Sequence, residues 1–188
     1  SFTGELCYEI NVPSSYANSA WKKCMEAGEE FDITPYGTEA MHVLRAEKGF
    51  IIVGQETDGS TTPIDLDMDW IVSKKKYDFI GKRALSRSDT IKEDRKQLVG
   101  ILTKDPNEIL EEGAQLVEKE SALPMTMVGH VTSSYYSPNL GRSFALALVK
   151  GGLNKKGFKL LVPMAKKTIE VKITNPVFID PSNERLSS

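Results

Sequence analysis

The first residues of the chain alternate between apolar and polar side chains, which is typical of a strand with one buried face. The apolar positions are Leu6, Tyr8, Ile10 and Val12, and the polar positions between them are Glu5, Cys7, Glu9 and Asn11. Pro13 and the two serines after it end this pattern and can cap a helix. We therefore predict a half-buried strand over residues 6–12.

Two helices and a second strand are predicted next. Apolar side chains recur at helical spacing from about residue 16 to residue 27, and Gly28 is placed to end that helix. A second helix is predicted over residues 37–48, and residues 50–53 are typical of a short buried strand. The order strand-helix-helix-strand indicates an α+β unit that is too small to be a complete sheet domain.

The middle of the chain is polar. Residues 54–69 are rich in turn-forming side chains, and such segments commonly carry function or connect domains. A short helix is predicted over residues 82–88, and the highly charged stretch 86–96 is the candidate boundary between two domains. We therefore divide the chain into residues 1–95 and 96–188.

Beyond that boundary the pattern predicts strands separated by turn-forming residues. The strands cover residues 98–102, 115–118, 126–136, 143–149, 159–162 and 167–173. Short strands at this spacing are typical of a small antiparallel barrel. The expected fold class is α+β, with a partial strand-helix-helix-strand domain followed by a small antiparallel β barrel.

Composition narrows the possible functions. Among the 188 residues, 24 Lys and Arg nearly balance 26 Asp and Glu, so the net charge of −2 gives no basic field for nucleic acid or an anionic membrane. No apolar run approaches the roughly 20 residues that cross a bilayer. Two histidines and two cysteines without metal-ligand spacing predict no metal site, and we expect a cytoplasmic protein with reduced thiols. Because the predicted strand begins almost at once, without a starting methionine, we expect a piece of a longer protein.

Several segments, in order, resemble one family. Residues 1–10 resemble the tyrosine-threonine-glycine-glutamate motif of the folate-dependent aminomethyltransferases, the glycine-cleavage T-protein family. Residues 44–49 resemble the family's leucine-arginine-leucine-glutamate-x-glycine helix, and residues 80–85 its phenylalanine-isoleucine-glycine-lysine segment. Residues 128–140 resemble the glycine-x-valine-threonine-serine pattern of its C-terminal barrel. The resemblance covers nearly the whole chain.

Within that family, residues 36–49, 54–59 and 74–76 are similar to the alpha subunits of heterotetrameric sarcosine oxidases. The resemblance implies a folate-binding region of an enzyme that demethylates sarcosine oxidatively to glycine. The one-carbon unit would pass to tetrahydrofolate as 5,10-methylenetetrahydrofolate. It implies tetrahydrofolate as the ligand of this region, FAD, FMN and NAD elsewhere in the whole enzyme, and a flavin-bearing beta subunit as a partner. This region alone is expected to be inactive.

The resemblance also implies candidate folate-binding residues. Glu9 matches the family's pterin-binding glutamate, whose carboxylate can accept two adjacent pterin N–H groups together. Glu5 lies on the same face of the predicted strand and is a weaker candidate. Met41 stands where the family has an arginine, and Arg45, one helical turn later, either replaces it or forms an ion pair within the fold. The catalytic residue is unknown, because the family's aspartate precedes the tyrosine-threonine-glycine motif.

Two other functions stay open. In the first, the chain is a structural module that docks the alpha subunit against its flavin-bearing partner, which the apolar Met41 favours. In the second, it belongs to a stand-alone folate-dependent aminomethyltransferase or demethylase, which an upstream dinucleotide-binding glycine motif would exclude. His42 and His130 are expected to be structural, and Lys74–Lys76 to be a solvated run, with attraction of phosphate or folate polyglutamate as the alternative.

Overall fold

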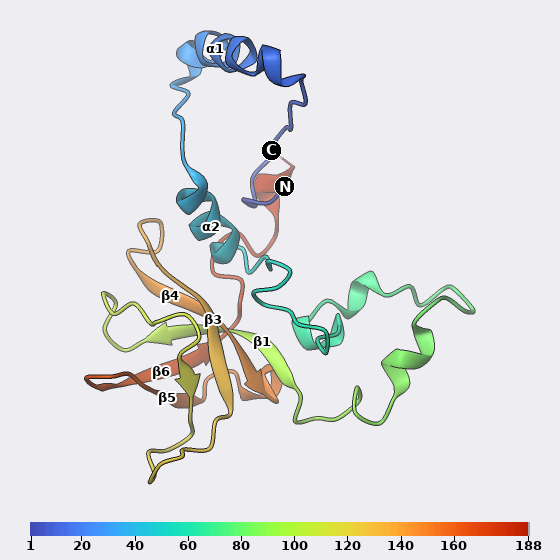
Figure 1. Ribbon diagram of the computed structural model, residues 1–188, viewed down its shortest axis with the longest axis vertical. Coiled ribbons are helices and arrows are strands. Elements are labelled where there is room, and N and C mark those ends of the chain that lie inside the picture. Colours follow the sequence, from blue (N-terminus) through green and yellow to red (C-terminus); the bar gives the residue numbers. More distant parts are fainter. Residues whose placement is uncertain (188) are drawn as a thin grey trace.

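The computed structural model describes residues 1–187, and a six-stranded antiparallel barrel lies at its centre (Figure 1). The strands are β1 (Lys96–Thr103), β2 (Gln115–Leu116), β3 (Gly129–Ser137), β4 (Arg142–Lys150), β5 (Lys159–Pro163) and β6 (Thr168–Thr174). Neighbours follow the order β2-β3-β4-β1-β6-β5. Val117 and Leu161 exchange two backbone hydrogen bonds of 2.9 Å, which joins the β2 end of the sheet to β5. The predicted strands and barrel are confirmed.

Alternation along the strands separates two apolar clusters. The first fills the barrel with side chains of every strand, including Val99, Leu116, Val131, Ala147, Leu160 and Val171. The second lies on the outer face of β1 and β4, where Leu98 and Leu146 belong to one cluster with Ala46 of the second helix. Strands β1 and β4 are therefore buried on both faces, which explains their nearly continuous apolar sequences.

Helix α2 (Thr38–Glu47) lies on this outer face of the barrel (Figure 1). Ala46 and the partly buried Val43 belong to the second cluster. The C-terminal segment, residues 178–187, covers the same cluster. The rings of Phe144 and Phe178 meet there edge to face, with centroids 4.9 Å apart. The packing of α2 and of the C-terminal segment on one face brings the two ends of the chain together.

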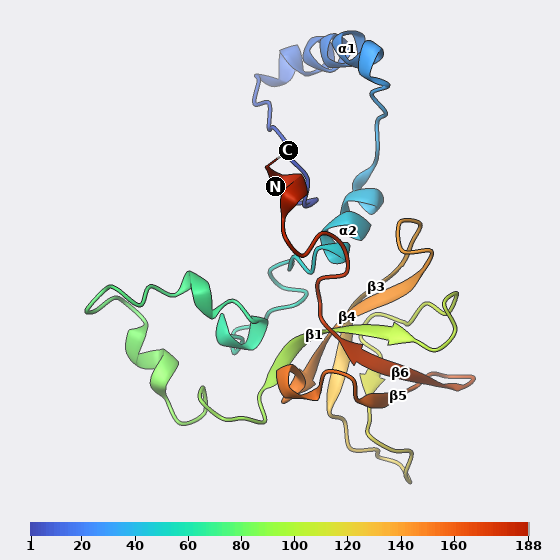
Figure 2. The ribbon, with the colours of Figure 1, turned by 180° about the vertical axis from the view of Figure 1, so that it is seen from behind.

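Two segments extend away from the barrel (Figure 2). Helix α1 (Ala17–Gly28) has no buried residue and lies at the far end of a loop that runs from the N-terminus to α2. Residues 67–95 form an arm with short 3-10 helices, among them Asp69–Ile71 and Lys82–Ser86. The two predicted helices near residues 16–27 and 37–48 are confirmed, and the predicted helix 82–88 is this shorter 3-10 helix.

The two strands predicted before the barrel are wrong. Residues 6–12 are exposed and irregular, because no strand of residues 1–187 lies beside them to complete a ladder. Residues 50–52 are irregular and lead into a turn over residues 53–56, where the N–H groups of Gln55 and Glu56 both donate to the carbonyl of Ile52. The α+β class and the barrel hold, while the first part contributes helices and irregular segments.

No helix in residues 1–187 has the length and apolar character required to cross a membrane. Strand β1 begins at Lys96, beside the predicted domain boundary. The division into residues 1–95 and 96–188 stays a prediction. Helix α2 belongs to the first part but packs directly on the barrel of the second.

Candidate functional site

The N-terminal segment, residues 1–12, lies beside the C-terminal segment, residues 178–187, near the end of α2 (Figures 1 and 2). The Leu6 N–H donates to the carbonyl of Arg185 at 2.9 Å, which is the one backbone hydrogen bond between these two segments among the described residues. This contact fixes the stretch of chain that carries the two glutamates predicted to bind a ligand.

Glu9 is exposed. Its Oε1 accepts a hydrogen bond from Nδ2 of Asn11 at 3.2 Å, and it forms no ion pair with another residue of the described chain. An ionised carboxylate has about four acceptor positions, so most of the acceptor capacity of Glu9 is open to an incoming ligand. A carboxylate with open acceptor positions can accept two adjacent N–H donors together.

Glu5 is already engaged. Its Oε1 accepts a hydrogen bond from Nη1 of Arg185 at 3.0 Å, between side chains that are both about half exposed. This hydrogen bond and the negative charge of Glu5 raise the pKa of the Arg185 guanidinium above its ordinary value. Glu5 and Glu9 therefore present one paired and one unpaired carboxylate on the same segment.

Arg45 points from α2 into the surface of the barrel, where it and Glu56 are both 0% exposed. Its Nη1 donates to Glu56 Oε2 at 2.9 Å and to the carbonyl of Phe50 at 3.1 Å. Its Nη2 donates to Ser133 Oγ at 2.6 Å, and its guanidinium lies 6.0 Å from the centre of the Tyr135 ring. Of the two alternatives predicted for Arg45, the structure shows the second, an ion pair within the fold.

Glu56 completes this buried cluster. Its Oε2 also accepts the Ile52 N–H at 2.8 Å, and its Oε1 accepts the hydroxyl of Ser133 at 2.5 Å. Met41 is half-buried one turn before Arg45 on α2. Because Arg45 is directed inward, it does not lie free to take the place of an arginine at position 41. None of Glu5, Glu9 and Arg45 bonds to another of the three.

Sequence reasoning missed further buried polar residues at the end of α2. Glu47 accepts hydrogen bonds from Ser137 Oγ at 2.5 Å and Asn139 Nδ2 at 3.0 Å, on the turn between β3 and β4. Lys48 is 4% exposed and bonds to the C-terminal segment. The signal was the charged run Arg45, Glu47, Lys48 before Gly49, which an exposed helix end would equally contain.

The remaining polar candidates lie apart from this region. His130 is half-buried on β3, and burial, followed by the nearby charge of Lys96, lowers its pKa. Lys74–Lys76 is exposed, and Lys74 pairs with Asp69 at 3.0 Å. Residues 1–187 hold no group of three histidine, cysteine or acidic side chains placed to bind a metal.

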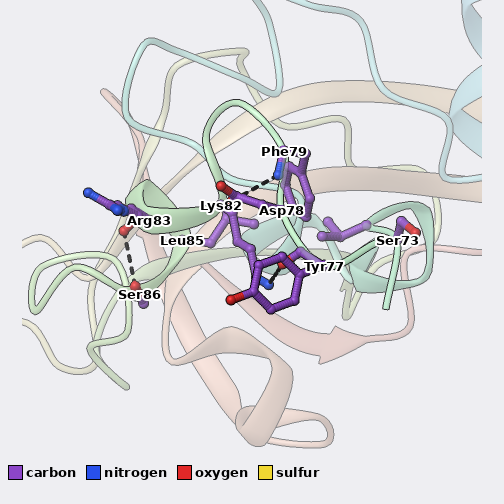
Figure 3. A pocket seen from close by; sticks show the side chains of 9 residues that line it. Ser73, Tyr77, Asp78, Phe79, Lys82, Arg83, Leu85 and Ser86 are labelled. Carbon is purple, nitrogen blue, oxygen red and sulfur yellow. Dashed lines mark hydrogen bonds between the residues drawn. The ribbon is translucent and has the colours of Figure 1, made fainter. Parts of the chain in front are cut away.

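A surface hollow lies on the arm, lined by residues between Val72 and Ser86 (Figure 3). Figure 3 shows Lys82 beside Tyr77, whose carbonyl accepts a hydrogen bond from the ammonium group, while Arg83 extends away from both. The apolar part of the lining is Val72, Phe79 and Leu85. All lining residues come from one exposed segment, and none is buried, so the hollow has no fixed polar group to orient a ligand.

Comparison with known families gives two successive matches along the chain. Residues 1–76 match the family model described as GCVT N-terminal domain, and residues 96–180 match the glycine cleavage T-protein C-terminal barrel domain. The chain belongs to the glycine-cleavage T-protein family. The crystal structure of glycine cleavage system aminomethyltransferase T from Bartonella henselae is similar to it, with a TM-score of 0.80 and 25% sequence identity. That similarity covers 96% of this chain and 48% of the Bartonella chain.

Two similar proteins are sarcosine oxidase alpha subunits. The subunit from Corynebacterium sp. (strain P-1) is 53% identical over 190 residues, which cover 98% of this chain and 19% of the relative. The subunit from Rhizobium meliloti (strain 1021) is 42% identical over 189 residues, which cover 99% of this chain and 19% of the relative. The chain therefore spans about a fifth of the length of these relatives, and nearly all of its residues align with them.

Proposed function

We propose that this chain is the folate-binding region of a sarcosine oxidase alpha subunit. In the proposed reaction, sarcosine is oxidatively demethylated to glycine, and the one-carbon unit passes to tetrahydrofolate as 5,10-methylenetetrahydrofolate. The observation that carries the proposal is the 53% identity with a sarcosine oxidase alpha subunit along 98% of this chain. The identity with the aminomethyltransferase structure is 25%, so the stand-alone aminomethyltransferase is the less favoured alternative.

Glu9 is the proposed pterin anchor. Its carboxylate is exposed and accepts a hydrogen bond from a single amide donor of the described residues, Asn11. A folate pterin would present its amino group and ring N–H side by side to the two carboxylate oxygens. These charge-assisted hydrogen bonds would fix the orientation of the ring.

Glu5 and Arg45 are the weaker members of the proposed set. Each already forms an ion pair, Glu5 with Arg185 and Arg45 with Glu56, and direct contact with folate would require that pair to open. Met41 offers no charge for the anionic glutamate part of folate, so we expect this region to hold the ligand mainly through its pterin. FAD, FMN and NAD are proposed for other parts of the enzyme, and the flavin-bearing beta subunit is the proposed partner.

A specific observation favours a second candidate function, subunit docking. Large apolar side chains are exposed on the loop that carries α1, including Tyr8 at 85%, Trp21 at 56% and Phe31 at 77% exposure. Exposed apolar patches commonly mark interaction surfaces. In this case the chain would contribute to assembly of the enzyme, and loss of Glu9 would leave its ligand binding unchanged.

The test is calorimetric titration of tetrahydrofolate into the assembled enzyme that contains the full alpha subunit. Glu9→Ala removes the proposed anchor, and Glu30→Ala is the matched control, since Glu30 is an exposed glutamate in the short 3-10 helix that follows α1. A charge-assisted hydrogen bond contributes about 1.5–3 kcal/mol, so the dissociation constant should rise by roughly 10- to 150-fold in Glu9→Ala alone. Equal affinity in all three proteins would refute the role of Glu9. Failure of the wild-type enzyme to bind tetrahydrofolate would refute the proposed function.

A further inference from the structure

Acceptors of the C-terminal segment surround Lys48, the buried lysine at the end of α2. The Lys48 ammonium donates to the Asp180 carbonyl at 2.5 Å, to Asp180 Oδ2 at 3.0 Å and to Asn183 Oδ1 at 2.9 Å. These three hydrogen bonds use the three N–H donors of an ammonium group. Lys48 and Asp180 are 4% and 8% exposed, so the ion pair is shielded from water. The end of the chain is therefore tied to the rigid surface formed by α2 and the barrel.

The backbone of this segment is bent to make these contacts. Asp180 and Asn183 have φ angles of 48° and 61°, in the left-handed region that Asp and Asn tolerate better than most residues. The Asp180 carboxylate also accepts the N–H groups of Glu184 at 3.0 Å and Arg185 at 3.2 Å. Burial raises the pKa of Asp180, but the hydrogen bonds from Lys48 and these amides outweigh it and hold the pKa below its ordinary value. Asp180 thus shapes the turn that delivers Arg185.

Arg185 in turn holds the N-terminal segment at two points. Its carbonyl accepts the Leu6 N–H at 2.9 Å, and its guanidinium pairs with Glu5 at 3.0 Å. Gly4 lies directly on the aliphatic stem of Lys48, where an added Cβ would overlap the lysine side chain, and its φ of 86° also favours glycine. The chain of contacts therefore runs from Lys48 through Asp180 and Arg185 to residues 4–6.

Glu9 lies three positions beyond Leu6, and its side chain accepts one hydrogen bond, from Asn11. We infer that Lys48, Asp180 and Arg185 are positioning residues for the pterin-binding carboxylate of Glu9, acting as a latch between the two ends of the chain. The inference rests on the proposed function for the ligand, and on the contacts above for the latch. These contacts hold residues 4–6 in place before a ligand binds Glu9, which reduces the conformational entropy lost on binding.

The experiment uses the assembled enzyme and two measurements on each variant. Arg185→Ala removes the guanidinium from a half-exposed site and is expected to fold, while Arg185→Lys is the conservative variant. Lys159→Ala is the matched control, because it removes a cation from an exposed ion pair of 2.9 Å on the barrel. The measurements are amide hydrogen exchange in residues 3–9 and the dissociation constant of tetrahydrofolate, with the rate of sarcosine oxidation without folate as a check on the assembled enzyme.

We expect Arg185→Ala to exchange faster in residues 3–9 and to bind tetrahydrofolate on the order of tenfold more weakly, the equivalent of one charge-assisted hydrogen bond. Arg185→Lys should recover most of the affinity, and Glu5→Arg combined with Arg185→Glu should restore slow exchange by reversing the ion pair. Oxidation without folate should be unchanged in the control Lys159→Ala, whose ion pair lies on the barrel.

Unchanged exchange in Arg185→Ala would overturn the inference, as would faster exchange with wild-type affinity. Both results leave the proposed function intact if Glu9→Ala still loses tetrahydrofolate. Failure of the wild-type enzyme to bind tetrahydrofolate would overturn the proposed function, and the inference with it, since no ligand site would remain to be positioned.

Discussion

Replacement of Arg45 by methionine removes the cation of the buried ion pair between α2 and the barrel. Methionine approximately keeps the length and apolar stem of the arginine side chain, so the change acts mainly on charge and hydrogen bonding. The Glu56 carboxylate then stays 0% exposed, with the Ser133 hydroxyl and the Ile52 N–H as its remaining donors. An ionised carboxylate in this place has no opposing charge.

The expected cost follows from that burial. Removal of one partner of a buried ion pair destabilises a protein by about 3–5 kcal/mol, because the other charge stays desolvated. For a chain of this size, each kcal/mol lowers the melting temperature by about 2–4 °C. We therefore expect Arg45→Met to melt roughly 6–20 °C below the wild type.

Urea unfolding, followed by far-UV circular dichroism, measures this loss as a fall in the midpoint with an unchanged slope. Lys74→Met is the matched control, because Lys74 pairs with Asp69 at 3.0 Å while their side chains are 79% and 58% exposed. Exposed pairs contribute about 0–1 kcal/mol, so this variant should unfold close to the wild type.

The double variant Arg45→Met with Glu56→Leu separates charge from packing. It removes both charges, so it should recover much of the stability lost in Arg45→Met. The reasoning is refuted if Arg45→Met costs no more than Lys74→Met. It is also refuted if the double variant loses the sum of the two single losses, because independent sites add and a coupled pair does not.

Three further predictions concern the barrel and the loop before the arm. Leu146→Ala should lower the free energy of unfolding in urea by about 2–5 kcal/mol, since this fully buried side chain leaves a cavity, and a wild-type midpoint would contradict it. Gly100→Ala should cost about 1–3 kcal/mol, because its Cβ would overlap the Asn175 carbonyl oxygen; equal thermal stability would show that the backbone yields freely. Asp58 should titrate at about 2 in carboxyl NMR, because the Ser60 hydroxyl and N–H bond to its carboxylate, and Ser60→Ala should move the pKa toward 3.8. The lowered pKa means that the loop stabilisation is present above pH 3.8 and is lost as the pH falls through about 2; a wild-type pKa of 3.8 would refute this.

The contrast between the two halves of the chain shows how far sequence patterns reach. In the barrel, alternation along β5 and β6 is local, and each strand finds its neighbour within residues 96–174, so pattern and structure agree. The alternation in residues 6–12 is equally regular, yet these residues form no strand. A strand needs a hydrogen-bonded neighbour, and a pattern within one segment does not supply it.

The candidate site divides in the same way. The residue types and their order identified Glu9, Glu5 and Arg45 by family resemblance, and the structure leaves the binding role of all three as a proposal. Sequence left Arg45 between a ligand contact and an internal ion pair, because a helical pattern does not show which way a long side chain turns. The contact that orients it, to Ser133, joins residues 88 positions apart.

The sequence by itself determined the α+β class, the two helices, the strands of the barrel and the family, because these depend on local periodicity and on motifs in a fixed order. Only the tertiary structure decided which charged residues are buried. Arg45, Glu47, Lys48 and Glu56 are all nearly inaccessible, although composition alone would place such residues at the surface. Their burial is possible because Arg45 and Glu56 pair with each other, while the barrel and the C-terminal segment supply further partners, Ser133, Ser137 and Asp180, from distant parts of the chain.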